Sequence, residues 1–217
     1  MPSVLEKNWQ LLEAQIKRLS PFFNFFQIDI ADGILVDNKT VQIEEIRPSV
    51  SNLSFDFHLM VRDYETEVKK VSSLTKIIKI KNIFIHFSVL PNFEILNTRY
   101  PDFKFGLVLD TEDRVKTVAR KYDLKKIPII QIMSVNSGRQ GNTFIPETLK
   151  KIEQLRLLDY GYKIFLDGGI NQQTIPFIIS QKYLPDYICP GSFLTKSPDL
   201  KKSIQYLNDI KLKTIIT

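Results

Sequence analysis

The chain has 217 residues, of which 43% are hydrophobic and 25% are charged, as in ordinary globular proteins. No apolar run reaches the roughly 18 residues that a membrane span needs, and the first seven residues lack the pattern of a secretory signal. The single cysteine, Cys189, excludes an internal disulfide and a thiolate zinc cluster, so we expect a cytoplasmic setting. The net charge of +6 comes from scattered lysines, so we expect a small phosphorylated partner and neither nucleic acid nor membrane.

Short runs rich in β-branched and aromatic residues recur along the whole chain. Most of them are continuously apolar, as expected for parallel strands that are covered on both faces. We predict eight strands, at Ser3–Leu5, Phe25–Ile30, Ser54–Met60, Asn82–Phe87, Lys104–Leu109, Pro128–Met133, Lys163–Asp167 and Asp186–Cys189.

Segments with helical spacing of apolar residues lie between these runs. In the first of them, Trp9, Leu12, Ile16 and Leu19 share one helical face. Asn171 is a good N-cap for a helix that runs through Ile175, Ile178 and Ile179. The other helices that we predict are Asn8–Leu19, Asp63–Leu74, Asn92–Thr98, Ile145–Leu158 and Lys196–Leu212.

Eight β-then-α units in one chain predict a single-domain (β/α)8 TIM barrel over residues 1–217. An open doubly wound sheet is the second interpretation. It fits less well, because no Gly-x-Gly-x-x-Gly follows the first strand. In a barrel the functional residues lie at the C-terminal ends of the strands, so the search for a site is confined to eight short places.

Polar side chains follow or end several of the predicted strands. Gln27 and Asp29 point the same way along the second strand, and a carboxylate inside a barrel is costly unless it is paired or binds a metal. His58 shares a face with Met60 on the third strand. The other histidine of the chain, His86, lies near the end of the fourth.

Glycine is scarce in this chain, and its placement is informative. Only eight glycines occur, and six of them lie between residues 138 and 191. The loop after the sixth strand carries two glycines. A glycine pair follows the seventh strand and one glycine follows the eighth, and these last two loops are where (β/α)8 barrels usually bind phosphate. Exposed backbone N–H groups there can receive an anion. The candidates after the seventh and eighth strands are Gly168, Gly169, Gly191 and Ser192, and the two glycines after the sixth strand are Gly138 and Gly141.

Short motifs along essentially the whole chain resemble, in order and spacing, those of the ribulose-phosphate 3-epimerase family. They are Pro2-Ser3-Val4-Leu5, Asp29-Ile30-Ala31-Asp32-Gly33, His58-Leu59-Met60-Val61, Gly106-Leu107, Met133-Ser134-Val135-Asn136, Phe144-Ile145-Pro146, Asp167-Gly168-Gly169-Ile170 and Gly191-Ser192.

The resemblance implies a barrel of the ribulose-phosphate-binding type. It also implies an isomerase that interconverts ketopentose 5-phosphate epimers at C3 through a metal-stabilised enediolate. It implies that Asp29 and Asp167 are the catalytic acid/base pair. It also implies one divalent metal ion (Zn, Fe, Mn, Co or Mg) on Asp29, His58 and Asp167, with Gln27 as a further candidate. The substrate would contact Ser3, His58, Met60 and Met133 and the phosphate segments named above. The oligomeric state stays open, with a homo-oligomer as one option.

Departures from the family pattern keep two alternatives open. Gln27 stands where the family has its first metal histidine, and Asp110-Thr111-Glu112 stands where it has Asn-Pro-Gly. These changes fit a divergent phosphosugar-binding or regulatory protein with weak or no epimerase activity. Another phosphate-binding barrel enzyme, of the orotidine-phosphate decarboxylase type, is a weaker alternative because Asp-x-Lys-x-x-Asp is absent.

Overall fold

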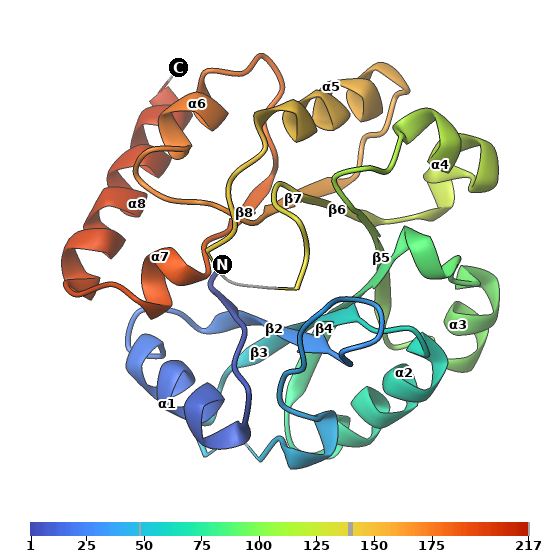
Figure 1. The fold of residues 1–217 in the computed structure, drawn as a ribbon, viewed down its shortest axis with the longest axis horizontal. Helices are drawn as coiled ribbons and strands as arrows, with labels where there is room; N and C mark the ends of the chain where they lie inside the picture. The colour runs from blue at the N-terminus through green and yellow to red at the C-terminus, as the bar shows by residue number, and fades with distance from the viewer. Residues whose placement is uncertain (48, 139–140, 217) are drawn as a thin grey trace.

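The computed structural model describes residues 1–47, 49–138 and 141–216, with side chains up to residue 210. Its eight parallel strands follow one another in chain order around a barrel (Figure 1). Bonds from Ser3 N to Pro190 O (3.4 Å) and from the Met1 amino group to Ile188 O (3.1 Å) bring the last strand to the first. The strands are β1 Ser3–Val4, β2 Phe25–Ala31, β3 Ser54–Met60, β4 Lys79–His86, β5 Lys104–Leu109, β6 Ile129–Met133, β7 Lys163–Asp167 and β8 Tyr187–Cys189.

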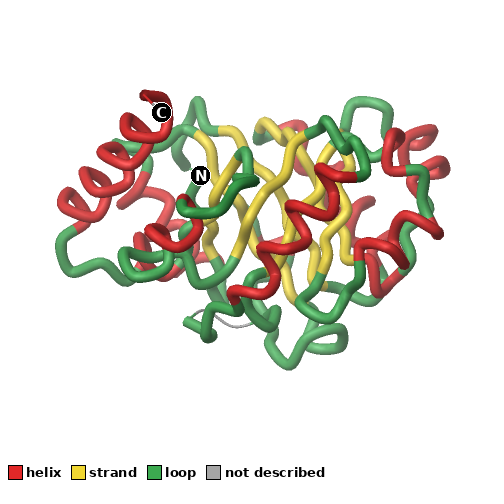
Figure 2. The backbone as a smooth tube through the Cα atoms, turned by 90° about the horizontal axis from the view of Figure 1, so that it is seen from above, coloured by secondary structure: helices red, strands yellow, loops and turns green. Residues whose placement is uncertain are grey.

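Helices surround the strands (Figure 1). The view turned by 90° shows the strands in the middle of the molecule (Figure 2). The α-helices are α1 Trp9–Leu19, α2 Tyr64–Ser73, α3 Phe93–Arg99, α4 Val115–Lys121, α5 Lys150–Leu157, α6 Ile175–Ile179, α7 Ser192–Thr195 and α8 Leu200–Ile216. Single-turn 3-10 helices are η1 Ile43–Glu45, η2 Leu74–Lys76, η3 Phe87–Val89, η4 Leu124–Lys126 and η5 Pro146–Leu149. Within the described part of the chain, none of the helices has the length and hydropathy needed to cross a membrane.

The predicted (β/α)8 barrel is confirmed, with corrections to four helical segments. Helix α4 was not predicted from the sequence. The connection between β2 and β3 contains no α-helix among its described residues, which leave out residue 48, and has only η1 there. The eight β-then-α units are therefore seven with an α-helix and one without.

The two other corrections concern where helices begin. Asn171 does not cap α6, because its Oδ1 accepts from the N–H groups of Gln173 (2.8 Å) and Thr174 (3.2 Å) and closes a turn before the helix. The last helix does not start at Lys196. A proline at residue 198 precedes it, and Asp199 Oδ1 accepts from Lys202 N at 3.0 Å, so α8 begins at Leu200.

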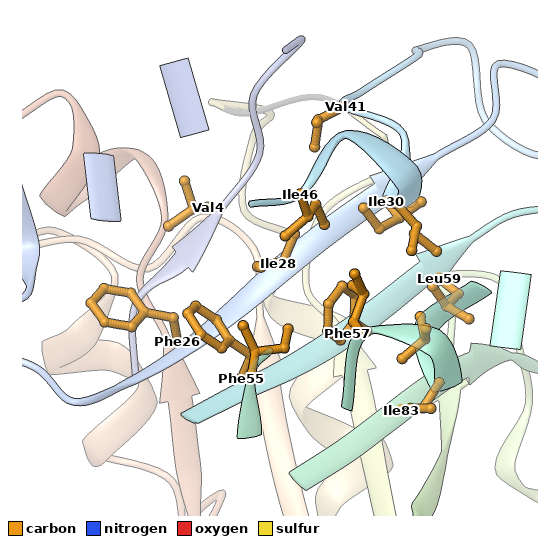
Figure 3. Close-up of a cluster of buried hydrophobic side chains, with 14 of the residues drawn as sticks. Val4, Phe26, Ile28, Ile30, Val41, Ile46, Phe55, Phe57, Leu59 and Ile83 are labelled. Carbon is orange, nitrogen blue, oxygen red and sulfur yellow. The ribbon is translucent and has the colours of Figure 1, made fainter. Parts of the chain in front are cut away.

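Alternating side chains of the strands form two separate packing layers. Outward residues, among them Phe26, Phe55 and Phe57, pack between the barrel and its helices (Figure 3). Inward residues, among them Phe84 and Phe165, pack in the interior of the barrel. A Cβ at Gly106 would lie 2.6 Å from the Phe84 ring, so this inner layer requires a glycine on β5.

Candidate active site

A pocket lies at the C-terminal ends of the strands. It gathers every residue that the sequence nominated for the site except Gln27. Leu5, Val135, Ser137 and Ile170 complete the lining, and none of these four was predicted. The predicted lining residues are Ser3, Asp29, His58, Met60, Met133, Gly138, Gly141, Asp167, Gly168, Gly169, Gly191 and Ser192. The parts that these residues play in binding and catalysis stay predictions.

Strand register brings two carboxylates and one imidazole together on the pocket floor. Asp29 on β2 is paired with His58 on β3, and Asp167 is the last residue of β7. His58 Nδ1 lies 3.2 Å from Asp29 Oδ1 and 3.7 Å from Asp167 Oδ2. One ligand atom from each of the three side chains lies within 4.8 Å of the others, so this group could hold a metal ion.

Gln27 lies two residues before Asp29 on β2 and is fully buried beneath the pocket. Its Nε2 donates to Asp29 Oδ1 at 2.9 Å and to Asp167 Oδ2 at 2.6 Å. Gln131 Nε2, from β6, donates to the same Asp167 oxygen at 3.1 Å. The Oε1 atoms of both glutamines have no hydrogen-bond partner in the described part of the chain. Gln27 therefore joins the two carboxylates, and it leaves a buried oxygen beside them.

Burial shifts the pKa values of all three groups toward their neutral forms. The pKa of Asp29 is raised to about 7, chiefly by burial. The pKa of Asp167 is raised to about 7 by burial and by the neighbouring Asp29 charge. Burial, with a smaller contribution from His86, lowers the pKa of His58 to about 3. A neutral imidazole keeps a lone pair for a metal, and carboxylates that titrate near pH 7 suit acid/base catalysis.

These donors fit a divalent ion. Two carboxylates that are buried together need a cation or a proton to offset their charge, and each of the three groups is an ordinary ligand of divalent metals. The Gln27 amide faces both carboxylates with its nitrogen, so its unpartnered Oε1 would become a further oxygen ligand only if the amide turned over. An amide oxygen is a poorer ligand than imidazole for transition metals, so the set favours a harder ion more than a set with a second histidine would.

The glycines after β6 and β7 have backbone conformations or surroundings that exclude side chains. Gly168 and Gly169 have φ of +104° and +64°, where other residues are strained. A Cβ at Gly169 would also lie 2.9 Å from Phe144 Cβ. This part of the pocket thus presents bare backbone to whatever enters it.

A further row of polar residues extends from the pocket floor toward the outside of the barrel. His58 Nε2 lies 2.8 Å from His86 Nε2, and His86 Nδ1 lies 2.7 Å from Asp110 Oδ2. The sequence places His86 near a strand end, but it predicts no role for His86 or for Asp110, Ser137 and Gln131. A polar residue at 131 in an otherwise apolar strand, on the face of Met133, was the signal that could have revealed Gln131.

Comparison with known proteins gives consistent relatives. Residues 1–191 match the model of the ribulose-phosphate 3 epimerase family. Proteins named ribulose-phosphate 3-epimerase from Bacillus subtilis and Methanocaldococcus jannaschii are both 27% identical to this chain. The alignments cover 97% and 98% of this chain and 98% and 91% of those proteins.

Solved structures share the fold at lower identity. KGPDC from Streptococcus mutans has a TM-score of 0.65 at 12% identity, covering 96% of this chain and 94% of that one. Orotidine 5'-phosphate decarboxylase from Pyrococcus horikoshii has a TM-score of 0.60 at 13% identity, with 96% and 98% covered. These likenesses support the barrel alone. With the match over 191 residues, the chain belongs to the ribulose-phosphate 3-epimerase family.

Proposed function

We propose that this protein is a sugar-phosphate 3-epimerase that interconverts ketopentose 5-phosphate epimers, such as ribulose 5-phosphate, at C3. The observation that carries the proposal is the meeting of Asp29 and Asp167 on the pocket floor, where a single Gln27 nitrogen bonds to both. Membership of the family supports it, and the alternative of a binding protein without turnover is not favoured. A cytoplasmic setting stays a prediction.

The two aspartates supply what inversion at a carbon next to a ketone requires. One carboxylate must remove the weakly acidic proton at C3, and a protonated carboxyl on the other face must deliver one. Asp29 and Asp167 come from strands β2 and β7, and burial raises both pKa values to about 7. Without a bound metal, the pair therefore favours one ionised and one protonated member near neutral pH, and the roles of the two exchange in the reverse reaction.

The rest of the pocket orients the sugar phosphate. Asp29, His58 and Asp167 would hold a divalent ion, which supplies Lewis-acid stabilisation of the charge that develops on the sugar's oxygens. The backbone of the glycine segments would receive the phosphate. Met60 and Met133 line the pocket as apolar residues and would exclude water from the reacting carbon. The named metals, the sugar and each of these contacts are proposals.

Solvent exchange at C3 tests the proposed reaction. Purified protein in D2O is mixed with ribulose 5-phosphate and a divalent metal, and NMR follows loss of the C3 proton signal and appearance of the C3 epimer. We expect both changes. Asp29→Asn and Asp167→Asn keep the size of each side chain but remove its basicity, and each should slow exchange by at least about 10²- to 10⁴-fold.

Asp56→Asn is the matched control for these variants. Asp56 is also a buried carboxylate inside the barrel, but it does not line the pocket, and its Oδ1 accepts two bonds from Asn82 that an asparagine can keep. The control should exchange at the parent rate. Absence of exchange with every divalent metal tried, or equal rates in Asp167→Asn and Asp56→Asn, overturns the proposed function.

A further inference from the structure

Two histidines and a carboxylate form a continuous hydrogen-bonded row behind the pocket. His58 and His86 are both buried, their ring planes are nearly parallel at 13°, and their Nε2 atoms are 2.8 Å apart. Asp110, which follows β5 directly, places Oδ2 2.7 Å from His86 Nδ1. The row ends at His58 Nδ1, which lies within hydrogen-bond distance of Asp29 Oδ1 (3.2 Å) and 3.7 Å from Asp167 Oδ2.

Asp110 is held as an ionised acceptor. Burial alone would raise its pKa, but the hydrogen bond from His86, the positive charge that His86 can carry and the Ser137 hydroxyl outweigh burial and lower that pKa to about 2. Ser137 Oγ donates to Asp110 Oδ1 at 2.5 Å. A carboxylate in this state only accepts hydrogen bonds, so His86 Nδ1 must donate to it.

The direction of the first bond decides the direction of the next. In its neutral form His86 has one N–H and one lone pair, so donation from Nδ1 requires it to accept at Nε2, whereas a charged His86 would donate from both nitrogens. The short contact between the two Nε2 atoms then needs His58 to donate from its own Nε2. The lone pair of His58 is left on Nδ1, on the side of Asp29 and Asp167.

We propose that His86 and Asp110 are positioning residues that select the His58 tautomer with a free Nδ1 facing the pocket aspartates. This inference rests on the proposed function, in which Nδ1 is a metal ligand. An asparagine amide can donate as well as accept, whereas an ionised aspartate permits only one direction. The orientation of a metal-binding histidine by a hydrogen bond to its other nitrogen has a large effect on metal affinity.

Ring-nitrogen NMR of metal-free protein labelled with ¹⁵N-histidine tests the tautomer directly. The chain has only two histidines, so four ring nitrogens account for all signals from the sequence, and His86→Gln assigns them. At about pH 7, where burial leaves the pair of Asp29 and Asp167 with one proton, we expect a proton on Nε2 of His58 and on Nδ1 of His86. A proton on Nδ1 of His58 in the parent protein overturns the proposal.

Substitutions at Asp110 test whether the carboxylate makes this selection. Its side chain is only partly buried, so Asp110→Asn and Asp110→Ala should both fold, which thermal unfolding checks. We expect mixed His58 tautomers in both variants. We also expect the dissociation constants for Zn²⁺ and Mn²⁺ to rise about 10- to 100-fold in Asp110→Ala and less in Asp110→Asn, where Oδ1 can still accept.

Asp63→Asn is the matched control, because it removes one negative charge beyond the C-terminal end of β3 and keeps the N-cap bond to Thr66 N. It should leave tautomers and metal affinity unchanged. Unchanged His58 signals in both Asp110 variants overturn the proposal. Since the tautomer is read without metal or substrate, a failed epimerase assay beside the expected tautomers refutes the proposed function and leaves this inference standing.

Discussion

Gln27 determines how the two pocket aspartates can share charge. Its amide nitrogen bonds to both of them, while its oxygen has no partner in the described part of the chain. In the absence of a cation, the amide lowers the cost of burying two acids together. In the presence of a cation, the same position has an amide, whose oxygen could serve as a ligand only after the amide turns over, and no imidazole. The residue therefore affects both the metal-free protein and the choice of ion.

Gln27→His should tighten Zn²⁺ binding by about tenfold or more, which corresponds to about 1.4 kcal/mol, and should change Mg²⁺ binding little. Imidazole is a good zinc ligand and a poor magnesium ligand, so the Zn²⁺/Mg²⁺ affinity ratio is the quantity to measure, by titration against a competing chelator. Gln27→Leu is the control, since it removes the amide without adding a ligand. A ratio that is the same in both variants contradicts the prediction.

The central site residues could be predicted from the sequence, whereas those around them could not. Asp29, His58 and Asp167 stand at strand ends within recognisable motifs, and alternation along a strand turns each of them inward. Gln131 reaches Asp167 only because the register pairs Met133 with Asp167 across β6 and β7. Asp110 depends likewise on a contact between the ends of β4 and β5, which no short motif records.

At the scale of elements, strands were predicted better than helices. Continuous apolar runs located all eight strands, although β4 begins at Lys79, three residues before the prediction. Helix α4 has only seven residues, and three of them and its N-cap residue are basic. Its apolar face consists of two buried valines, Val115 and Val118, which are too few to give a clear helical period. The predicted start of α6 was wrong because the Asn171 side chain closes a turn before the helix and does not cap it.

Asp186 joins three elements near the start of β8. Its carboxylate accepts from Ile164 N (2.8 Å), Arg156 Nη2 (2.8 Å) and Lys163 Nζ (3.0 Å), and so links α5 and β7 to the segment before β8. Burial raises the pKa of Asp186, but the hydrogen bonds from Ile164, Lys163 and Arg156 outweigh burial, and the pKa is lowered overall.

Asp186→Asn should lower the free energy of unfolding at about pH 7 by about 1–3 kcal/mol, the usual worth of hydrogen bonds to a charged group. The folded pKa lies below that of the unfolded chain. The contribution is therefore fully present above about pH 4 and is lost as pH falls through the folded pKa. Urea unfolding across this range should show the difference between variant and parent shrinking in acid. The exposed Asp209→Asn should show little difference at any pH, and a gap that grows in acid contradicts the prediction.

At the scale of the molecule, the barrel depends on the join between its last and first strands. Strand β1 has two residues, and a single backbone bond from Ser3 to Pro190 links it toward β8. Arg18 of α1 reinforces the join from outside, since its guanidinium donates to the carbonyls of Leu194 (3.1 Å), Thr195 (2.9 Å) and Ser197 (2.6 Å). One side chain thus holds the segment after the last strand against the first helix.

Arg18→Ala should lower the free energy of unfolding by about 2 kcal/mol, because three carbonyls lose a charged donor. Arg18→Lys keeps the charge but not the planar fork, so its loss should be intermediate. Lys17→Ala removes only an exposed pair with Glu13 and should cost less than about 1 kcal/mol. Equal losses in Arg18→Ala and Lys17→Ala contradict the role of Arg18.

We propose that residues 1–217 form one domain, so urea unfolding of every variant should follow a single transition with the parent m-value. A second transition contradicts the single domain.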